Sequence, residues 1–187
     1  MYSGLFNSDN KPLLPGLFFT CYNGYMNDNV SFFNTASPIA TSKTTGKPTF
    51  GATSNISTLD TGTNGCISTT STPQSFSIQW LGYFKPNVTS STWYFRTTSD
   101  DCSYLWIGSN AITGFTTGNA NVNNGGLHGD VTVRSNAITL TVDVYYPLRI
   151  QQGGGNFNNT MKVEFSRDNV NWYSDGNYDE NQRYFHS

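Results

Sequence analysis

The chain has 187 residues, of which 12% are charged and 15% aromatic, and its net charge at pH 7 is -2. Few charges and many aromatic side chains exclude an intrinsically disordered chain, which needs the opposite composition. No basic run is present to neutralise phosphates, and no apolar stretch approaches the roughly 20 residues of a membrane-spanning helix. We therefore expect neither a nucleic-acid partner nor membrane insertion.

The length fits one domain, which we expect to span residues 1–187. Residues 1–20 lack a basic start followed by an apolar core, so no signal peptide is expected. Cys21, Cys66 and Cys102 lack the close spacing of a zinc motif. One disulfide can form, but the sequence does not select the pair, and the odd number of cysteines slightly favours free thiols.

The first part of the chain contains weak strand signals. We expect a strand over 16–22, an Asn-Gly turn after it, and a short strand over 30–33. Residues 34–75 are dominated by Thr, Ser, Gly, Asn and Pro. Only short edge strands are expected there, near 48–50 and 66–68, and the alternative is a mobile linker.

A clear strand pattern begins at residue 76. Apolar and polar side chains alternate with period two over 76–84, and Lys85-Pro86-Asn87 ends that strand. A second strand is predicted over 93–98, so the two are expected to form an antiparallel hairpin. Residues 104–107 are expected to pack back as a third strand.

The C-terminal half continues the pattern after a Gly/Asn-rich loop over 113–136. Further strands are expected at 138–142, 145–151 and 160–165. Pro147 donates no ladder hydrogen bond, which implies an edge or strand-start position. No amphipathic helix of three turns is present. The fold class is therefore all-β: an antiparallel β-sandwich or barrel-like sandwich.

Two adjacent aspartates, Asp100 and Asp101, lie in the short gap between the strands at 93–98 and 104–107. Carboxylates held this close raise each other's pKa unless a cation or hydrogen-bond donors neutralise them. A hard cation such as calcium takes carboxylate, amide and main-chain oxygens as ligands. The pair is therefore a candidate metal site, and the alternative is a solvated turn.

The sequence resembles the PA14 domain family over residues 15–167. The resemblance is carried, in order, by Phe76–Phe84, Tyr94–Asp101, Leu105–Gly108, Leu140–Ile150, Gly153–Gly155 and Lys162–Ser166, after an N-terminal segment with Pro15-Gly16-Leu17, Tyr22 and Phe32-Phe33. It implies a β-sandwich or barrel-like fold. Many members of the family bind carbohydrate, and in its adhesins two adjacent aspartates joined by a cis peptide hold one calcium ion.

On this resemblance, Asp100 and Asp101 are the aspartate pair that binds both calcium and sugar. A second loop supplies further oxygen ligands, and the matching segment here is 152–159. Candidate ligands in it are the side-chain amides of Gln152 and Asn156 and the carbonyl of Gly154. Neighbouring hydroxyls of the sugar complete the calcium shell.

Other residues of the carbohydrate site are expected in and beside the second loop. Gly153 and Gly155 permit a close backbone approach, and the loops at 99–103 and 152–160 can lie at one end of the sandwich. His128 can line the rim, or serve only as a turn residue. Aromatic candidates for stacking on a sugar are Trp106, Phe115, Phe157 and Trp172. Trp106 alternates within a strand and is assigned to the core, whereas Phe157 lies in the glycine loop and is the preferred stacking residue.

The sequence contains no sign of an enzyme. Adjacent loop carboxylates do not match the spacing of glycosidase acids, and no nucleophile elbow or phosphate loop is present. The hypothesis is a calcium-dependent lectin or adhesin module, located outside the cell or on a cell or virion surface, within a larger or multivalent protein. The alternative is a structural PA14-like domain that binds no sugar.

Overall fold

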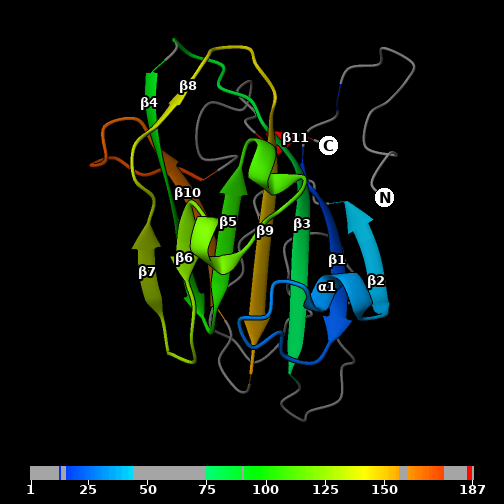
Figure 1. Cartoon of the computed structure of the whole chain (residues 1–187). Coiled ribbons are helices and arrows are strands. Elements are labelled where there is room, and N and C mark those ends of the chain that lie inside the picture. The colour runs from blue at the N-terminus through cyan, green and yellow to red at the C-terminus, as the bar shows by residue number, and fades with distance from the viewer. Residues whose placement is uncertain are drawn as a thin grey trace.

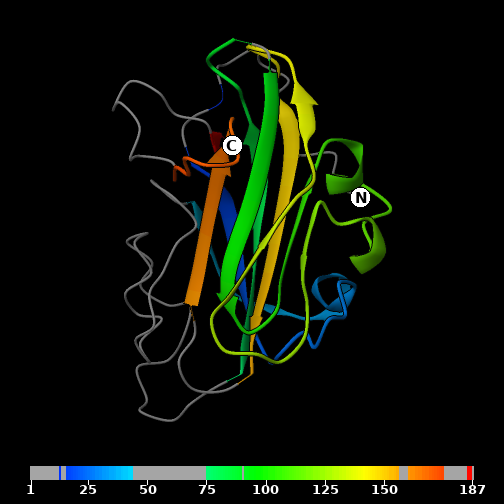
Figure 2. The ribbon, with the colours of Figure 1, turned by 90° about the vertical axis from the view of Figure 1, so that its left-hand side faces the viewer.

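Two antiparallel sheets face each other and form a β-sandwich that does not close into a barrel (Figures 1 and 2). The computed structural model describes residues 13, 16–43, 75–89, 91–155, 160–174 and 185–186. The larger sheet has the order β2 (Pro38–Lys43), β1 (Phe18–Asn23), β3 (Phe76–Phe84), β9 (Tyr146–Gly154), β5 (Ser103–Ile107) and β6 (Val122–Asn124), and β11 (Phe185–His186) also pairs with β3. The smaller sheet has the order β10 (Thr160–Ser166), β4 (Ser91–Asp100) and β7 (Val131–Arg134), and β8 (Ile138–Leu140) also pairs with β4. The predicted all-β sandwich is confirmed.

The main core lies between the two sheets and is rich in aromatic rings. It contains Phe19, Trp80 and Phe84 from the larger sheet, together with Trp93, Phe95 and Phe165 from the smaller one. On β4, buried and half-buried residues alternate, so each inward side chain enters this core while its neighbours face outward. This alternation of burial is what a period-two pattern in the sequence predicts for a strand with one buried face.

A second core covers the opposite face of the larger sheet. It contains Tyr22, Met26, Val30, Phe33, Cys102, Tyr104, Trp106 and Ala111. The short helix α1 (Phe32–Thr35) and two 3₁₀ turns, Ser109–Ala111 and Thr117–Asn119, lie on this side (Figure 2). All nine residues of β3 are therefore buried.

The predicted strand over 30–33 is wrong, because α1 occupies this position. Hydrogen bonds from Asn29 N to Met26 O and from Phe32 N to Asn29 O turn the chain before the helix, each at 2.9 Å. The side chain of Asn29 also accepts from Ser31 N at 3.1 Å. Phe33 is then buried against Tyr22, with ring centroids 5.1 Å apart.

The predicted hairpin of 76–84 with 93–98 is also wrong. Both edges of β3 are paired, with β1 on one side and β9 on the other, whereas β4 lies in the smaller sheet between β10 and β7. The chain therefore crosses between sheets after β3, and it crosses back between β4 and β5. The strand predicted at 104–107 is present as β5, but it pairs with β9 and β6 rather than extending a hairpin.

Several segments contain more strand than their composition indicated. The polar stretch 34–75 includes β2, an edge strand paired with β1, and the Gly/Asn-rich loop 113–136 includes β6 and β7. The expected strands at 48–50 and 66–68 lie outside the described residues. Strand β9 continues through Gly154, so the second loop starts later than 152. Pro147 is the second residue of this interior strand, which agrees with a strand start and not with an edge.

The three cysteines differ in state. Cys21 is disulfide-bonded, which corrects the inclination toward free thiols, and Cys102 is a buried free thiol. The remaining cysteine, Cys66, lies outside the described part of the chain. Burial raises the pKa of the Cys102 thiol to about 11, so it is protonated at neutral pH. None of the helices in the described part of the chain could span a membrane.

Candidate functional site

The aspartate pair lies where the chain passes from β4 in the smaller sheet to β5 in the larger one, at the lower end of the sandwich in Figure 1. The peptide bond between Asp100 and Asp101 is cis, as the resemblance implies. Strand β9 ends beside this crossing, because Gln152 is the ladder partner of Ser103. The two loops therefore meet at one end of the sandwich.

Asp101 is held in place by main-chain donors from two other segments. Its Oδ2 accepts a hydrogen bond from Gly155 N at 2.7 Å, and its Oδ1 accepts one from His128 N at 3.1 Å. The residue is only 7% exposed. Each carboxylate oxygen has a second lone pair, so the group can still coordinate a cation.

Asp100 is half-buried at the end of β4, with Thr160 as its ladder partner on β10. Burial raises the pKa of its carboxyl, and the negative charges of Asp101 and Asp130 raise it further, while His128 lowers it. The site therefore holds several carboxylates close together, where partial burial and mutual repulsion disfavour their charged forms. A bound cation would remove this cost.

Gln152 is completely buried and lies against the aspartate pair. Its Nε2 donates to the main-chain oxygen of Asp100 at 3.3 Å. Its Oε1 is buried and has no hydrogen-bond partner among the described residues. A buried amide oxygen without a donor is rare, and it suits a hard cation as a ligand.

The three glycines at the end of β9 have different surroundings. A Cβ on Gly153 would come within 2.7 Å of Met26 Cγ, and one on Gly155 within 3.1 Å of Asp101 Oδ2. Gly154 is the ladder partner of Phe76 and lies inside the sheet. The backbone of Gly155 reaches Asp101 closely because no side chain intervenes. Asn156 and Phe157, the other candidates of this loop, lie outside the described residues.

A chain of buried side chains supports the aspartate pair from inside the sandwich. Ser103 Oγ donates to Thr97 Oγ1 at 2.8 Å and lies 2.7 Å from Ser99 Oγ. Asn124 Nδ2 donates to Ser99 Oγ at 3.0 Å and to Val131 O at 2.9 Å. These residues link β4, β5, β6 and β7 around the pair. The sequence analysis did not identify them, and their only local signal is a polar residue at an inward position of a strand.

A second missed contact connects the β1–α1 segment to the segment between β6 and β7. Asp28 Oδ1 accepts hydrogen bonds from Tyr104 Oη at 2.7 Å and from Gly126 N at 3.0 Å. Burial, followed by the hydrogen bond to Asp28, raises the pKa of Tyr104, so its hydroxyl remains a donor. Asp28 thus positions the segment that carries His128.

His128 lies at the rim, half-buried, with each ring nitrogen near a main-chain oxygen, and the one that carries the proton can donate. Nδ1 is 2.8 Å from Gly129 O, and Nε2 is 3.4 Å from Asn124 O. Its neighbour Leu127 is 69% exposed, and Leu127 Cδ2 is 3.2 Å from the position of a Cβ on Gly155. An exposed apolar side chain therefore borders the aspartate pair.

The aromatic residues considered for stacking on a sugar lie in different parts of the molecule. Trp106 is fully buried in the second core, as expected, and Phe115 packs against it with ring centroids 5.7 Å apart. Trp172 lies over the guanidinium of Arg96, on the smaller sheet. None of these three touches the aspartate pair through an observed contact.

The candidate ligands at this end of the sandwich are oxygen atoms. No group of three or more His, Cys, Asp or Glu side chains gathers anywhere in the described ranges. The two carboxylates and the amide oxygen of Gln152 are ligand types that a hard cation such as calcium takes, and zinc prefers others.

Comparisons with known proteins bear on the fold of the chain. Residues 76–167 match the GLEYA domain. Among curated proteins, none matches the chain. Solved structures similar to it include the PA14 domain of the MpAFP antifreeze protein, with 16% identity and a TM-score of 0.62 over 90% of this chain and 91% of that one.

Two sugar-binding domains have similar folds. The A domain of epithelial adhesin 6 from Candida glabrata, solved in complex with Galβ1-3GlcNAc, has 16% identity and a TM-score of 0.63 over 88% of this chain and 85% of that one. The PA14 sugar-binding domain of an RTX adhesin has 15% identity and a TM-score of 0.63 over 86% and 94%. The GLEYA match over residues 76–167 and the similarity to these solved structures show that the chain has a PA14-type fold.

Proposed function

We propose that this domain binds carbohydrate through a calcium ion held by Asp100 and Asp101, and that it acts in adhesion. The observation that carries the proposal is the fixed carboxylate of Asp101, which accepts main-chain hydrogen bonds from two loops beside a second carboxylate with a raised pKa. A structural turn needs no such concentration of buried charge. A calcium site does, because the ion offsets the repulsion.

Each residue has a distinct role in this mechanism. Calcium, when bound, supplies the positive charge that attracts sugar hydroxyl oxygens. Gly155 N and His128 N orient the carboxylate of Asp101, and Gln152 Oε1 offers a further oxygen. Asn156 and the carbonyl of Gly154 stay candidates for the remaining ligands.

The sugar itself would lie against the rim beside the aspartate pair. Leu127 provides an exposed apolar surface for the carbon face of a sugar ring, and His128 borders it. Gly155 keeps the backbone of the second loop close to Asp101, whereas Gly153 packs against Met26 of the second core. Phe157 is retained as the candidate stacking residue. The similarity to adhesin domains solved with galactosides supports a neutral, galactose-containing glycan as the first probe.

One such site buries little area, so its affinity for a single sugar should be weak. Adhesion would then depend on several copies acting together, as in a larger or multivalent protein at a cell surface. No catalytic arrangement is needed for this role, and the domain is proposed to be a binding module and not an enzyme.

The first test is thermal unfolding of the protein with calcium and with excess chelator. A ligand that binds only the folded state adds about 2.7 kcal/mol to its stability at a hundredfold excess over Kd. We expect the unfolding temperature to rise with calcium. Glycan-array binding should then require calcium and disappear with chelator.

Two substitutions test the aspartate pair directly. Asp100→Asn should abolish the calcium-dependent rise and glycan binding while leaving the fold intact, because this side chain is half-buried. Asp101→Asn should abolish both and also destabilise the fold by about 1–3 kcal/mol, because an amide nitrogen would face a main-chain donor.

Asp143→Asn is the matched control, since that exposed aspartate pairs only with Lys85 in the observed ion pairs. Calcium-dependent glycan binding that survives in Asp100→Asn would overturn the mechanism. Calcium binding without any glycan binding would favour a structural PA14-like domain instead.

A further inference from the structure

The outward face of the smaller sheet carries an unusual row of charges. On β4, Arg96 has Glu164 of β10 as its ladder partner on one side and Arg134 of β7 on the other. Two arginines are therefore directly cross-strand, an arrangement of like charges that does not stabilise a sheet. The stability of the sheet therefore does not explain why Arg96 and Arg134 lie opposite each other.

Glu164 cannot neutralise the whole cluster. Its carboxylate receives Arg96 Nε at 2.7 Å and Lys162 Nζ at 2.7 Å. Arg134 is exposed and has no anionic partner among the described residues. The face thus has surplus positive charge in a chain whose net charge is -2.

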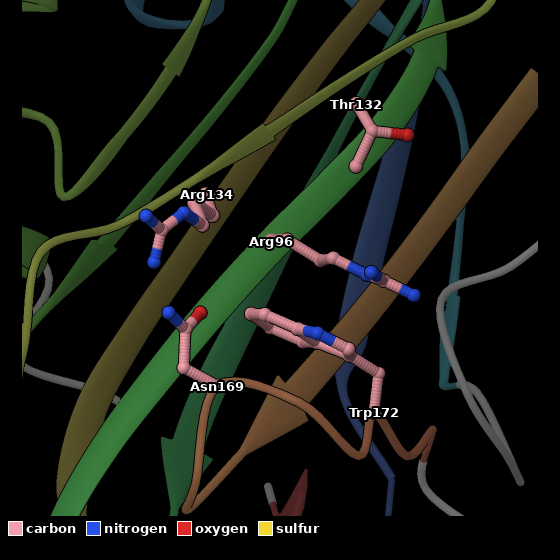
Figure 3. Close-up of a pocket in the computed structure, with 5 residues that line it drawn as sticks. All are labelled: Arg96, Thr132, Arg134, Asn169 and Trp172. Atoms are coloured by element: carbon pink, nitrogen blue, oxygen red, sulfur yellow. The ribbon is translucent and has the colours of Figure 1, made fainter.

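A turn brings further groups over this face. Strand β10 is followed by residues 167–172, and the chain returns with two hydrogen bonds of 2.9 Å between Phe165 and Tyr173. Asp168 accepts from the main-chain nitrogens of Val170 and Asn171 and so shapes the turn. Trp172 is thereby placed with its ring centroid 4.3 Å from Arg96 Cζ (Figure 3).

Together these elements form a pocket of about 420 Å³, lined by Arg96, Thr132, Arg134, Asn169 and Trp172 (Figure 3). Its volume lies in the range of small-molecule sites. Asn169 Oδ1 is buried and has no hydrogen-bond partner among the described residues. The pocket therefore offers a charged donor, an aromatic ring and an unused acceptor.

We propose that this pocket is a second glycan site, which takes a sugar bearing a carboxylate. The guanidinium of Arg134 can bind a carboxylate with two parallel hydrogen bonds. A ring hydroxyl would supply the donor that Asn169 Oδ1 lacks, and Trp172 offers apolar surface for the ring carbons. A bare anion would satisfy the arginine only, whereas an acidic sugar matches all three groups.

This site is separate from the aspartate pair. Arg96 precedes Asp100 by four residues on β4, about 13 Å at the rise of an extended strand. None of its lining residues belongs to the proposed calcium site, so the two proposals succeed or fail independently.

The test is an NMR titration of the ¹⁵N-labelled protein in excess chelator, with methyl glucuronide and methyl galacturonide, and with methyl glucoside as the neutral match. We expect at least one uronide to shift the indole signal of Trp172, assigned with Trp172→Phe, and the glucoside to leave it unchanged. Arg134→Gln should weaken uronide binding at least tenfold.

Lys85→Gln is the control for the loss of one positive charge elsewhere, and it should bind like the wild type. The proposal is overturned if neither uronide binds, or if the glucoside binds equally well. It is also overturned if Arg134→Gln retains the wild-type affinity, or if acetate binds as tightly as the uronides, since the pocket would then recognise an anion only.

Discussion

At the scale of single residues, the site depends on how closely a backbone can approach a carboxylate. Gly155 N lies 2.7 Å from Asp101 Oδ2 in the folded chain. A side chain at position 155 would enter the space between Asp101 and Leu127. The glycine therefore matters for its missing Cβ and not for an unusual backbone angle.

We predict that Gly155→Ala weakens calcium binding severalfold, with a smaller effect on the fold. The new Cβ would lie 3.1 Å from Asp101 Oδ2 and 3.2 Å from Leu127 Cδ2, so the carboxylate must shift. Isothermal titration with calcium measures the change. Gly129→Ala is the matched control, because a Cβ there meets no atom within 4 Å. Equal calcium affinity in the two variants would contradict the prediction.

At the scale of elements, polar side chains join strands that the ladders alone do not. Asn124 on β6 binds Ser99 on β4 and the main chain of β7, so it connects the larger sheet to the smaller one beside the aspartate pair. Glu164 on β10 binds Arg96, its ladder partner on β4, so this ion pair reinforces a pairing that the ladder already makes. The Asn124 contacts lie at the end of the smaller sheet beside the aspartate pair, and the Glu164–Arg96 ion pair lies on its outward face.

Asn124→Ala should destabilise the fold by about 1–3 kcal/mol, because the buried Ser99 Oγ and the part-buried Val131 O lose a donor. Urea denaturation gives the free energy of unfolding. Asn123→Ala provides the comparison, since this exposed neighbour donates only to Thr117 O, at 2.9 Å, and its loss should cost less than about 0.5 kcal/mol. Equal losses in the two variants would show that the buried connection is not important.

Glu164 predicts a specific pH dependence. Burial raises the pKa of its carboxyl, but hydrogen bonds from Arg96 and Lys162 outweigh this and hold it below its ordinary value of 4.5. A lowered folded-state pKa contributes stability above the unfolded value, and this stability is lost as the pH falls through the folded value.

Glu164→Gln should therefore destabilise the protein by about 1–3 kcal/mol at pH 7, and the difference from wild type should shrink below about pH 4. Urea denaturation at several pH values measures it. Asp143→Asn should cost less than about 1 kcal/mol, because its ion pair with Lys85 is exposed. A difference that stays constant from pH 7 to pH 3 would argue against the ion pair as its cause.

At the scale of the whole molecule, aromatic packing joins the two sheets. Phe84, at the end of β3, contacts Trp93 and Phe95 on β4, Phe165 on β10 and Phe185 on β11, with ring centroids 4.9–6.0 Å apart. This one side chain links both sheets and the C-terminal strand. Because β3 and β4 form no hairpin, aromatic packing connects these two strands and a ladder of main-chain hydrogen bonds does not.

Phe84→Ala should lower the free energy of unfolding by about 3–5 kcal/mol, because it leaves a cavity at this junction. Chemical denaturation measures the loss. Val170→Ala serves as the exposed control, because Val170 is 76% exposed and its truncation should change stability by less than about 0.5 kcal/mol. A loss below 1 kcal/mol in Phe84→Ala would mean that the sheets are joined mainly elsewhere.

Local sequence patterns were enough to predict where most strands lie. Period two is a local property of an extended chain, and the burial pattern of β4 shows it directly, whereas all nine residues of β3 are buried. The adjacent aspartates and the order of the matching segments also pointed to the PA14-type fold. Short strands in polar sequence, such as β2 and β6, have too few residues to show a period.

The pairing of the strands and the residues around the aspartate pair became clear only from the folded structure. Alternation marks a strand but does not name its partner, so β3 and β4 were expected in one hairpin although they lie in different sheets. Asn124, Asp28 and Gln152 reach the site from distant segments. Their roles depend on long-range packing, which local sequence patterns do not encode.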